Sequence, residues 1–348
     1  MEKKKNGKRS VKKILLAILC VILALVLIAL LAVVIIGKSM LGKINRFDET
    51  QPTLSSSEIE QILQETDPPD PTFTGPVLTP EEVTIPTAPT EIVTDSDNII
   101  NFLLVGQDRR EGEPRQRSDS MILVTINKSK KTLTMTSFLR DIWLTIPGYY
   151  DQRLNVPYVI GGFDLLNATL ERNFGVSSDN NIEVDFNGFI DIIDTVGGVD
   201  IYLTSAEANH LNESSDWNLH EGSNCLTGKQ ALDYSRIRVI GMDFGRTNRQ
   251  RTVLLSLFNK IKSLSWLEMY PLLNKILPLV TTDMTDDEIL TYAKELLVIL
   301  PELEIVSQRI PVDDYYYFAT VQGNSVILLG EEGTQKAIEL IQQTVSGK

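Results

Sequence analysis

Residues 99–108 read IINFLLVGQD, an almost continuous apolar run that ends at Gly106 and is followed by a glutamine and an aspartate. A run without alternating polar side chains is typical of a strand that is buried on both faces. Two β-rich runs follow at residues 120–126 and 131–137, and the polar segment 127–130 between them favours an antiparallel hairpin. The sequence therefore predicts that a sheet begins at residue 99.

Strand and helix patterns continue to the end of the chain and have no internal repeat. Mixed strands and helices favour an α/β (α+β) fold, a three-layer domain with a central mixed sheet flanked by helices. Further strands are predicted at residues 142–146, 182–186, 199–203 and 303–310, and helices at residues 163–174, 189–196, 227–234, 248–264, 286–299 and 332–345.

The amino-terminal region predicts a membrane anchor. Residues 14–36 are 23 residues without a charge, which as a helix would reach about 34 Å and span a bilayer. Seven of the first thirteen residues are basic, and this bias predicts a cytoplasmic head at residues 1–13. A cleaved signal peptide would have a shorter apolar stretch, and a basic cluster directly before a span is a topology signal rather than a nucleic-acid site. We expect a single-pass protein of the cell membrane with an extracellular carboxy-terminal domain.

The segment 37–98 predicts an extracytoplasmic linker that is rich in proline, threonine and acidic residues. Residues 47–98 hold eight of the fifteen prolines and twelve acids but no base, a composition typical of an extended tether. The working domain is then residues 99–348. The whole chain carries −13, of which residues 1–46 contribute +9 and residues 47–98 contribute −12, so residues 99–348 carry −10.

Several catalytic mechanisms are improbable. The chain has two histidines, His210 and His220, and both lie in a polar stretch, which disfavours a serine triad and a histidine-rich zinc site. No glycine-rich phosphate loop or dinucleotide fingerprint occurs. Cys225 is the single cysteine outside the predicted span, so no disulfide can link parts of the outer domain. Carboxylates and arginines must carry the chemistry.

Two clusters supply these groups. The first lies at predicted strand ends, where side chains of an α/β sheet often form a site: Gly106-Gln107-Asp108-Arg109, Arg117-Ser118-Asp119-Ser120 and Leu139-Arg140-Asp141. The second has five arginines and one acid within residues 236–251: Arg236, Arg238, Asp243, Arg246, Arg249 and Arg251.

Helical spacing places part of the second cluster on a buried face. Counting back from the apolar stripe of residues 253–261 puts Arg246, Arg249 and Gln250 on the same face. Arginines at a helix amino terminus oppose its dipole, and a bound phosphate would relieve this cost. The alternative is that they pair with internal acids such as Asp108, Asp119 and Asp141. Two carboxylates suit Mg²⁺ and the arginines suit a pyrophosphate, so the clusters together indicate phosphoryl transfer.

At these residues the chain resembles the LytR-CpsA-Psr family of cell-wall proteins. The resemblance covers residues 101–260, and its motifs keep one order. A departure is Leu139, where the family usually has proline, and residues 207–224 match poorly. The motifs are Gly106-Gln107-Asp108, Arg117-Ser118-Asp119, Arg140-Asp141, Asn155 with Gly161-Gly162, residues 186–189, 197–200, 226–232 and 234–238, and Asp243-Phe244-Gly245-Arg246 with Arg249-Gln250.

The resemblance implies a phosphotransferase. It would move an anionic glycopolymer, such as a teichoic acid or capsule, from a polyprenyl-pyrophosphate carrier to peptidoglycan by forming a phosphodiester. It also implies Mg²⁺ or Mn²⁺ on Asp108 and Asp119 and catalytic roles for Asp119, Arg140 and Asp141. Phosphate contacts would come from Arg117, Arg140, Arg236, Arg238, Arg246 and Gln250. Two alternatives are a polyprenyl-pyrophosphate hydrolase and a non-catalytic binding or regulatory protein of the envelope.

Overall fold

The computed structural model describes residues 39–47, 54–66, 75–86, 98–109 and 113–345. The predicted head and anchor, residues 1–36, lie outside the described residues. Among the helices that are described, none combines the length and the apolar character needed to cross a membrane. The described residues from Asn45 onward form one compact unit.

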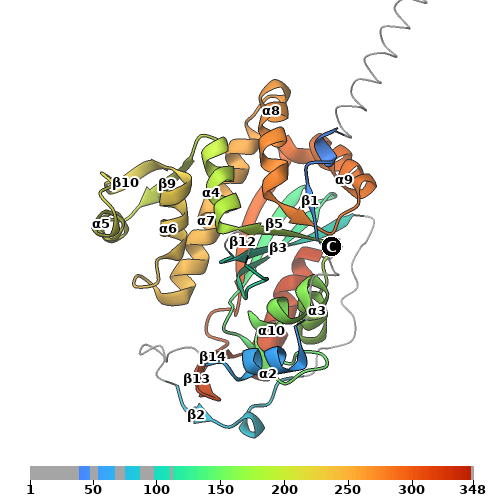
Figure 1. Cartoon of the computed structure of the whole chain (residues 1–348), viewed down its shortest axis with the longest axis vertical. Helices are drawn as coiled ribbons and strands as arrows, with labels where there is room; N and C mark the ends of the chain where they lie inside the picture. Colours follow the sequence, from blue (N-terminus) through green and yellow to red (C-terminus); the bar gives the residue numbers. More distant parts are fainter. Residues whose placement is uncertain (1–38, 48–53, 67–74, 87–97, 110–112, 346–348) are drawn as a thin grey trace, which may run out of the picture. The chain divides into compact units, whose positions relative to one another are not determined.

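The centre of this unit is a mixed seven-stranded sheet in the order β1-β11-β8-β3-β4-β5-β12 (Figure 1). The predicted hairpin is present as the antiparallel pair β4 and β5, while β3 runs parallel to β8 and β5 runs parallel to β12. The strands are β1 (Asn45–Arg46), β3 (Ile99–Gln107), β4 (Ser118–Asn127), β5 (Thr132–Phe138), β8 (Asn180–Asp185), β11 (Thr281–Thr282) and β12 (Glu304–Ile310).

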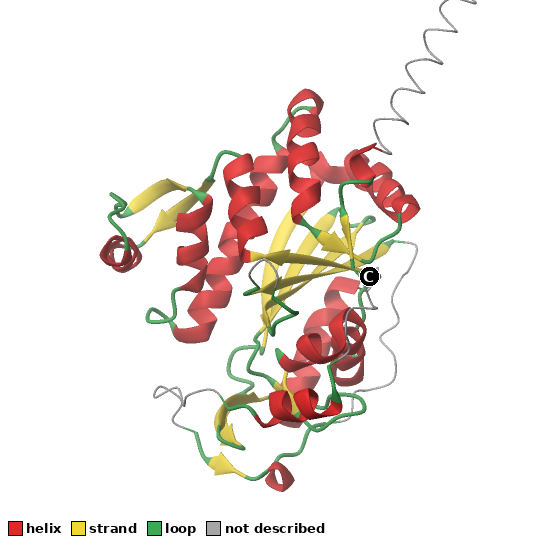
Figure 2. Ribbon diagram, viewed as in Figure 1, coloured by secondary structure: helices red, strands yellow, loops and turns green. Residues whose placement is uncertain are grey.

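Helices cover both faces of the sheet, so the predicted architecture of a mixed sheet flanked by helices is confirmed (Figure 2). Alternating side chains of β4 divide between the two faces. Met121 and Leu123 pack in the core of α3 and α10, whereas Ile122 and Val124 pack against residues of α7 and α9. The helices of these layers are α3 (Val156–Phe174), α7 (Met242–Lys262), α9 (Asp286–Ile299) and α10 (Gly330–Val345).

A smaller module with its own core stands beside the sheet. A two-stranded antiparallel sheet packs with helices that also contact α7. Helices α4 and α6 approach closely at Gly228, where an added Cβ would lie 2.2 Å from the carbonyl oxygen of Ile190. The module and its neighbours are α4 (Phe186–Thr195), β9 (Val199–Leu203), α5 (Ser205–Ser214), β10 (Gly222–Leu226), α6 (Gly228–Arg236) and α8 (Trp266–Ile276).

Several local predictions differ from the structure. Helix α3 begins at Val156 rather than at residue 163, with a kink at Gly161 and Gly162, and helix α8 was not predicted. Helix α7 begins at Met242 rather than at residue 248, because Gly241 takes the left-handed conformation (φ 77°) that starts the helix early. Helix α5, for which no helix was predicted, lies in the polar stretch that contains both histidines, and a capping box between Thr204 and Glu207 begins it. The strand expected at residues 142–146 is only β6 (Trp143–Leu144), paired with β7 (Gln152–Arg153).

Parts of the predicted linker are folded against the domain. Helix α2 (Ser56–Gln64) packs its apolar side on α3. Strand β2 (Val77–Leu78) pairs with β13 (Tyr317–Val321), which forms a hairpin with β14 (Asn324–Leu328). The sequence did not predict these contacts, because the segment is rich in proline and acids and each folded part buries only a few apolar side chains. Three short 3₁₀ turns complete the described elements: η1 (Pro80–Glu82), η2 (Leu277–Leu279) and η3 (Leu300–Glu302).

Candidate active site

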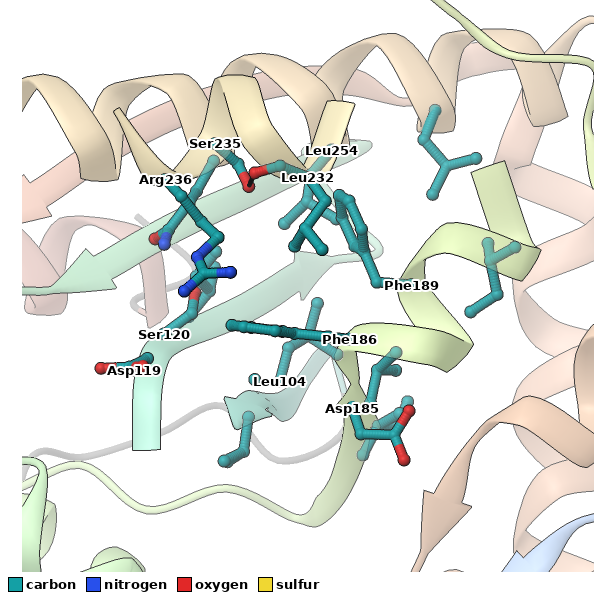
Figure 3. Close-up of a pocket in the computed structure, with 18 of the residues that line it drawn as sticks. Leu104, Asp119, Ser120, Asp185, Phe186, Phe189, Leu232, Ser235, Arg236 and Leu254 are labelled. Atoms are coloured by element: carbon teal, nitrogen blue, oxygen red, sulfur yellow. Dashed lines mark hydrogen bonds between the residues drawn. The ribbon is translucent and has the colours of Figure 1, made fainter. Parts of the chain in front are cut away.

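A cavity of about 670 Å³ lies between one face of the sheet and the helices α4, α6, α7 and α8. Most of its lining is apolar, and we call the part that carries the charged and amide side chains its mouth. Figure 3 shows Asp119 and Arg236 of this part close together, apart from Phe189, Leu232 and Leu254. The apolar lining includes Leu104, Ile122, Ile182, Val184, Phe189, Ile192, Leu232, Leu254, Leu257, Phe258, Ile261, Ile276 and Val280. The charged or amide side chains of the lining are Asp108, Asp119, Asp185, Arg236, Arg238, Arg246 and Gln250. This division suits a ligand with a long apolar part and an anionic head.

The two mouth carboxylates stand at adjacent strand ends. The register of β3 and β4 shifts between Gly106 and Gln107, and Asp108 follows directly after β3 while Asp119 is the second residue of β4. Each carboxylate already has a guanidinium neighbour. Arg236 Nη2 lies 3.7 Å from Asp108 Oδ2, and Arg140 Nη1 donates to Asp119 Oδ1 at 2.6 Å.

In the turn after β5, the carboxylate of Asp141 lies beside the guanidinium group of Arg140. Asp141 Oδ1 lies 3.6 Å from both Arg140 Nε and Arg153 Nη1. Burial raises the pKa of Asp141 despite these two cations. Burial lowers the pKa of Arg140, but Asp141 and Asp119 outweigh it and the net shift is upward. Arg140 therefore stays a cation. Neither residue lines the cavity, but Arg140 meets the lining residue Asp119, and Asp141 orients Arg140.

The turn contains Leu139 at the position where the family usually has proline, and this leucine contributes both a buried side chain and a backbone hydrogen bond. The side chain is fully buried, and its N–H donates to the carbonyl of Ile310 at 3.0 Å. A proline could not make this bond because it has no N–H.

The arginines of α6 and α7 complete the mouth. Arg236, the last residue of α6, lies over the ring of Phe186 with 4.8 Å between the guanidinium carbon and the ring centroid. Arg246 is 4% exposed and pairs with Asp243 at 2.6 Å. Burial lowers the pKa of Arg246, and the positive charges of Arg140 and Arg238 add to this against Asp243. Crowded cations of this kind favour an anionic ligand.

Comparison with known proteins identifies the family of this chain. The sequence model of the LytR_cpsA_psr family matches residues 69–339. The chain belongs to the LytR-CpsA-Psr family.

Relatives within the family include named transferases and a named regulator. The polyisoprenyl-teichoic acid–peptidoglycan teichoic acid transferase TagU of Bacillus mycoides is 35% identical over 199 residues, which are 56% of this chain and 64% of that protein. The match thus spans less than two thirds of TagU. The regulatory protein MsrR of Staphylococcus aureus is 31% identical over 64% of this chain and 67% of MsrR.

Solved structures of the LytR-CpsA-Psr family share the fold. TagT bound to LIIa-WTA superposes with a TM-score of 0.60 at 26% identity and covers 71% of this chain and 91% of TagT. The protein gbs0355 of Streptococcus agalactiae gives a TM-score of 0.61 at 26% identity, with 73% and 90% covered.

None of the three arginines of the first cluster lines the cavity itself. Arg140 reaches only its edge, through the hydrogen bond to Asp119, and the other two turn elsewhere. Arg109 turns to the other face of the sheet, where its Nη2 lies 3.0 Å from Oε1 of the buried Glu183. Arg117, which the family motif places on phosphate, donates to the carbonyl of Ile62 at 3.1 Å and pairs with Glu65 at 3.0 Å. Its partners come from the linker segment, which sequence reasoning treated as a tether.

One arginine of the second cluster is also structural. Arg249 was expected on the same inward face as Arg246, but its Nε donates to Glu207 at 2.7 Å. Its two terminal nitrogens donate to the carbonyls of Ile237 at 3.1 Å and Ile240 at 2.8 Å. Arg249 therefore fixes the loop that carries Arg238. The alternative of internal ion pairs therefore describes Arg249 fully, and it holds in part for Arg236 with Asp108 and for Arg246 with Asp243.

Sequence reasoning gave no role to Phe186 and Asp243. Phe186 provides the platform under Arg236, and Asp243 is the partner of Arg246. Asp243 carried a signal, since it is the single acid among five arginines of residues 236–251. Phe186 carried only its place in the motif of residues 186–189.

The mouth carboxylates fit one mode of Mg²⁺ binding. No three acidic, histidine or cysteine side chains of the described residues group to form a complete cation site. Mg²⁺ is commonly held by one or two carboxylates together with substrate phosphates and water. Asp108 and Asp119 both line the cavity mouth beside the arginines, so they can supply that share of the ligands.

Proposed function

We propose that the protein transfers an anionic glycopolymer from a polyprenyl-pyrophosphate carrier to a hydroxyl group of peptidoglycan. The apolar cavity with an arginine-lined mouth carries this proposal. Its interior suits an isoprenoid tail. Arg236 and Arg246 in its lining, together with Arg140 paired to the lining residue Asp119, would meet the pyrophosphate. The names of TagU and TagT concern those proteins, and they support the proposed substrate class here.

The reaction is a displacement at the phosphorus that bears the polymer. The oxygen of the acceptor hydroxyl forms a new P–O bond, the P–O bond to the carrier phosphate breaks, and polyprenyl phosphate leaves while the hydroxyl loses its proton. The chain's own residues act by position and charge. Arg140 and Arg246 stabilise the charge that develops on phosphate oxygens, and Asp141 holds Arg140 in place. Mg²⁺ or Mn²⁺ on Asp108 and Asp119 would neutralise further phosphate charge.

The direct test uses the full chain, a labelled lipid-pyrophosphate glycan and wall fragments. The transferase moves label to the fragments, and a hydrolase releases it to water. A binding or regulatory protein, as the name MsrR suggests for that relative, leaves the lipid intact. Label that never joins the fragments contradicts the proposal.

Filling the cavity should weaken binding of the tail. Leu254 lines the cavity and is half-buried, so Leu254→Trp should displace part of a long isoprenoid. A loss of two or three buried methylene groups is worth about 2 kcal/mol, or roughly thirtyfold in KM. A carrier of two isoprene units should lose less. Leu290→Trp, at a position that is 48% exposed on α9, is the control. It should change the KM neither for the long carrier nor for the short carrier. Equal effects on long and short carriers would place the tail elsewhere.

The metal proposal rests on Asp119. Asp119→Asn removes a charge and keeps the volume, so we expect loss of Mg²⁺ stimulation and at least a tenfold fall in transfer, with an unchanged fold. Activity is measured against Mg²⁺ concentration and in chelator. Asp200→Asn, at an exposed position in β9, should behave like wild type. Full activity of Asp119→Asn, or of wild type in chelator, excludes the metal role.

A further inference from the structure

A second cavity of about 330 Å³ lies apart from the reaction site. Three segments build it: helix α2 of the linker segment, the loop before β7, and the turn that joins β13 to β14. It shares no lining residue with the apolar cavity. We call it the polar cavity. The side chains that matter are Glu60, Gln64, Tyr150, Asp151, Gln152 and Gln322.

Gln152 fixes the wall of the polar cavity. Its side chain is 2% exposed, its Nε2 donates to the carbonyl of Leu63 at 2.9 Å, and its Oε1 accepts the backbone N–H of Arg153 at 2.9 Å. On α2, Gln64 Nε2 donates to Glu60 Oε1 at 2.7 Å. Both ends of the Gln152 amide are therefore used, so the docked helix α2 is part of the wall.

The chemistry of the lining selects a class of ligand. Glu60 and Asp151 are acids, and no lysine or arginine is among the described residues that line this cavity. An anion is therefore disfavoured. The amide of Gln322 can offer both a donor and an acceptor, and Gln64 Oε1 a further acceptor, because the Gln152 amide and Gln64 Nε2 are already bonded. These groups suit a ligand with hydroxyl and amide groups.

An exposed aromatic ring adds a platform. Tyr150 is 70% exposed at the cavity. An aromatic face that large gains stability when an apolar surface covers it, and its hydroxyl keeps a polar contact. The flat carbon face of a sugar ring meets both needs. We propose that the polar cavity binds a neutral, N-acetylated aminosugar unit of a glycan, stacked on Tyr150.

The position of the polar cavity connects it to the reaction site. Arg117 contacts Ile62 and Glu65 at the end of α2, and Asp119 at the cavity mouth follows two residues later. Two residues of extended chain span about 7 Å. The Arg117 side chain adds to this distance, so a glycan held beside α2 needs several sugar units to reach the mouth. If the proposed function holds, this glycan is the acceptor, because the acidic lining repels an anionic donor polymer.

The test is calorimetric titration of the detergent-solubilised full chain with a tetramer of β-1,4-linked N-acetylglucosamine. We expect saturable binding that Tyr150→Ala weakens about three- to tenfold, the worth of one aromatic contact. Gln64→Ala should also weaken it. Tyr149→Ala is the matched control, since Tyr149 is 39% exposed and does not line the cavity, and it should bind like wild type.

Three results overturn the proposal: no saturable binding, an equal loss in Tyr149→Ala, or full competition by a glycerol-phosphate polymer. The readout needs no catalysis, so it separates this proposal from the transferase. Sugar binding without label transfer keeps the polar cavity and removes the proposed function. Transfer without sugar binding does the reverse.

Discussion

Arg246→Ala is expected to lower transfer by about a hundred- to a thousandfold, the cost of removing one preorganised contact to developing charge. Arg246 lines the cavity mouth, and its buried Nε has no hydrogen-bond partner within the described structure. A phosphate oxygen would provide that partner. In wild type, a polyprenyl pyrophosphate at a hundred times its Kd should stabilise the fold by about 2.7 kcal/mol. Most of this gain should disappear in Arg246→Ala.

The stability of the ligand-free variant has two opposing contributions. The substitution relieves repulsion from Arg140 and Arg238, but it leaves Asp243 without its ion pair at 2.6 Å. Breaking a buried pair costs about 3 to 5 kcal/mol, so we expect the variant to be less stable without ligand. The additional substitution Asp243→Asn should recover part of that loss but none of the activity.

Arg251→Ala provides the comparison on the same helix. Arg251 is also buried, at 7% exposed, and it does not line the cavity. The measurement is thermal unfolding of wild type, Arg246→Ala and Arg251→Ala, each with and without the polyprenyl pyrophosphate. Arg251→Ala should keep the ligand-induced rise in Tm, whatever its own stability. If wild type shows no rise, or if Arg246→Ala keeps the full rise, Arg246 does not bind the pyrophosphate.

The parts of the site that the sequence predicted are those set by local pattern. Asp108 and Asp119 follow from strands whose apolar runs are evident, and adjacent strands bring their ends together. Arg246 and Gln250 are four residues apart on one helix, so they share a face in any fold. The structure places all four at the cavity mouth.

The parts that the sequence missed depend on distant partners. Arg246 and Arg249 are three residues apart, which turns their side chains about 60° from each other around the helix. Because of that angle, Arg246 points to the cavity while Arg249 points to Glu207, which is 42 residues from Arg249 in sequence. Likewise, Glu65 is 52 residues from Arg117 and belongs to a segment whose composition resembles a tether. Nothing local to either arginine shows which carboxylate reaches it.

Arg249→Ala is the second substitution from which we expect a large effect, although Arg249 does not line the cavity. It removes three hydrogen bonds and leaves Glu207, 8% exposed, without its cation. The expected loss of stability is about 3 kcal/mol, the lower end for a buried pair. The loop from Ile237 to Ile240 also loses its support, and a small displacement of Arg238 can cost about a hundredfold in activity. Lys229→Ala breaks an exposed pair with Asp233 and should change stability by less than about 1 kcal/mol.

The dependence on pH distinguishes this ion pair from packing alone. Burial raises the pKa of Glu207, but hydrogen bonds from Thr204 and Arg249 outweigh it, so the pKa is lowered from its ordinary value of 4.5. A lowered carboxylate pKa means that the pair contributes fully above the unfolded-state pKa and is lost as the pH falls through the folded-state value. Below about pH 4.5 the unpaired carboxylate of Arg249→Ala is also protonated and its penalty disappears. The difference in Tm between wild type and Arg249→Ala, measured from pH 7 to pH 3, should therefore become smaller as the pH falls. When both proteins also carry Glu207→Gln, the difference in Tm caused by Arg249→Ala should change little with pH. A difference between wild type and Arg249→Ala that stays constant with pH would mean that Arg249 supports the loop through its two carbonyl contacts and not through Glu207.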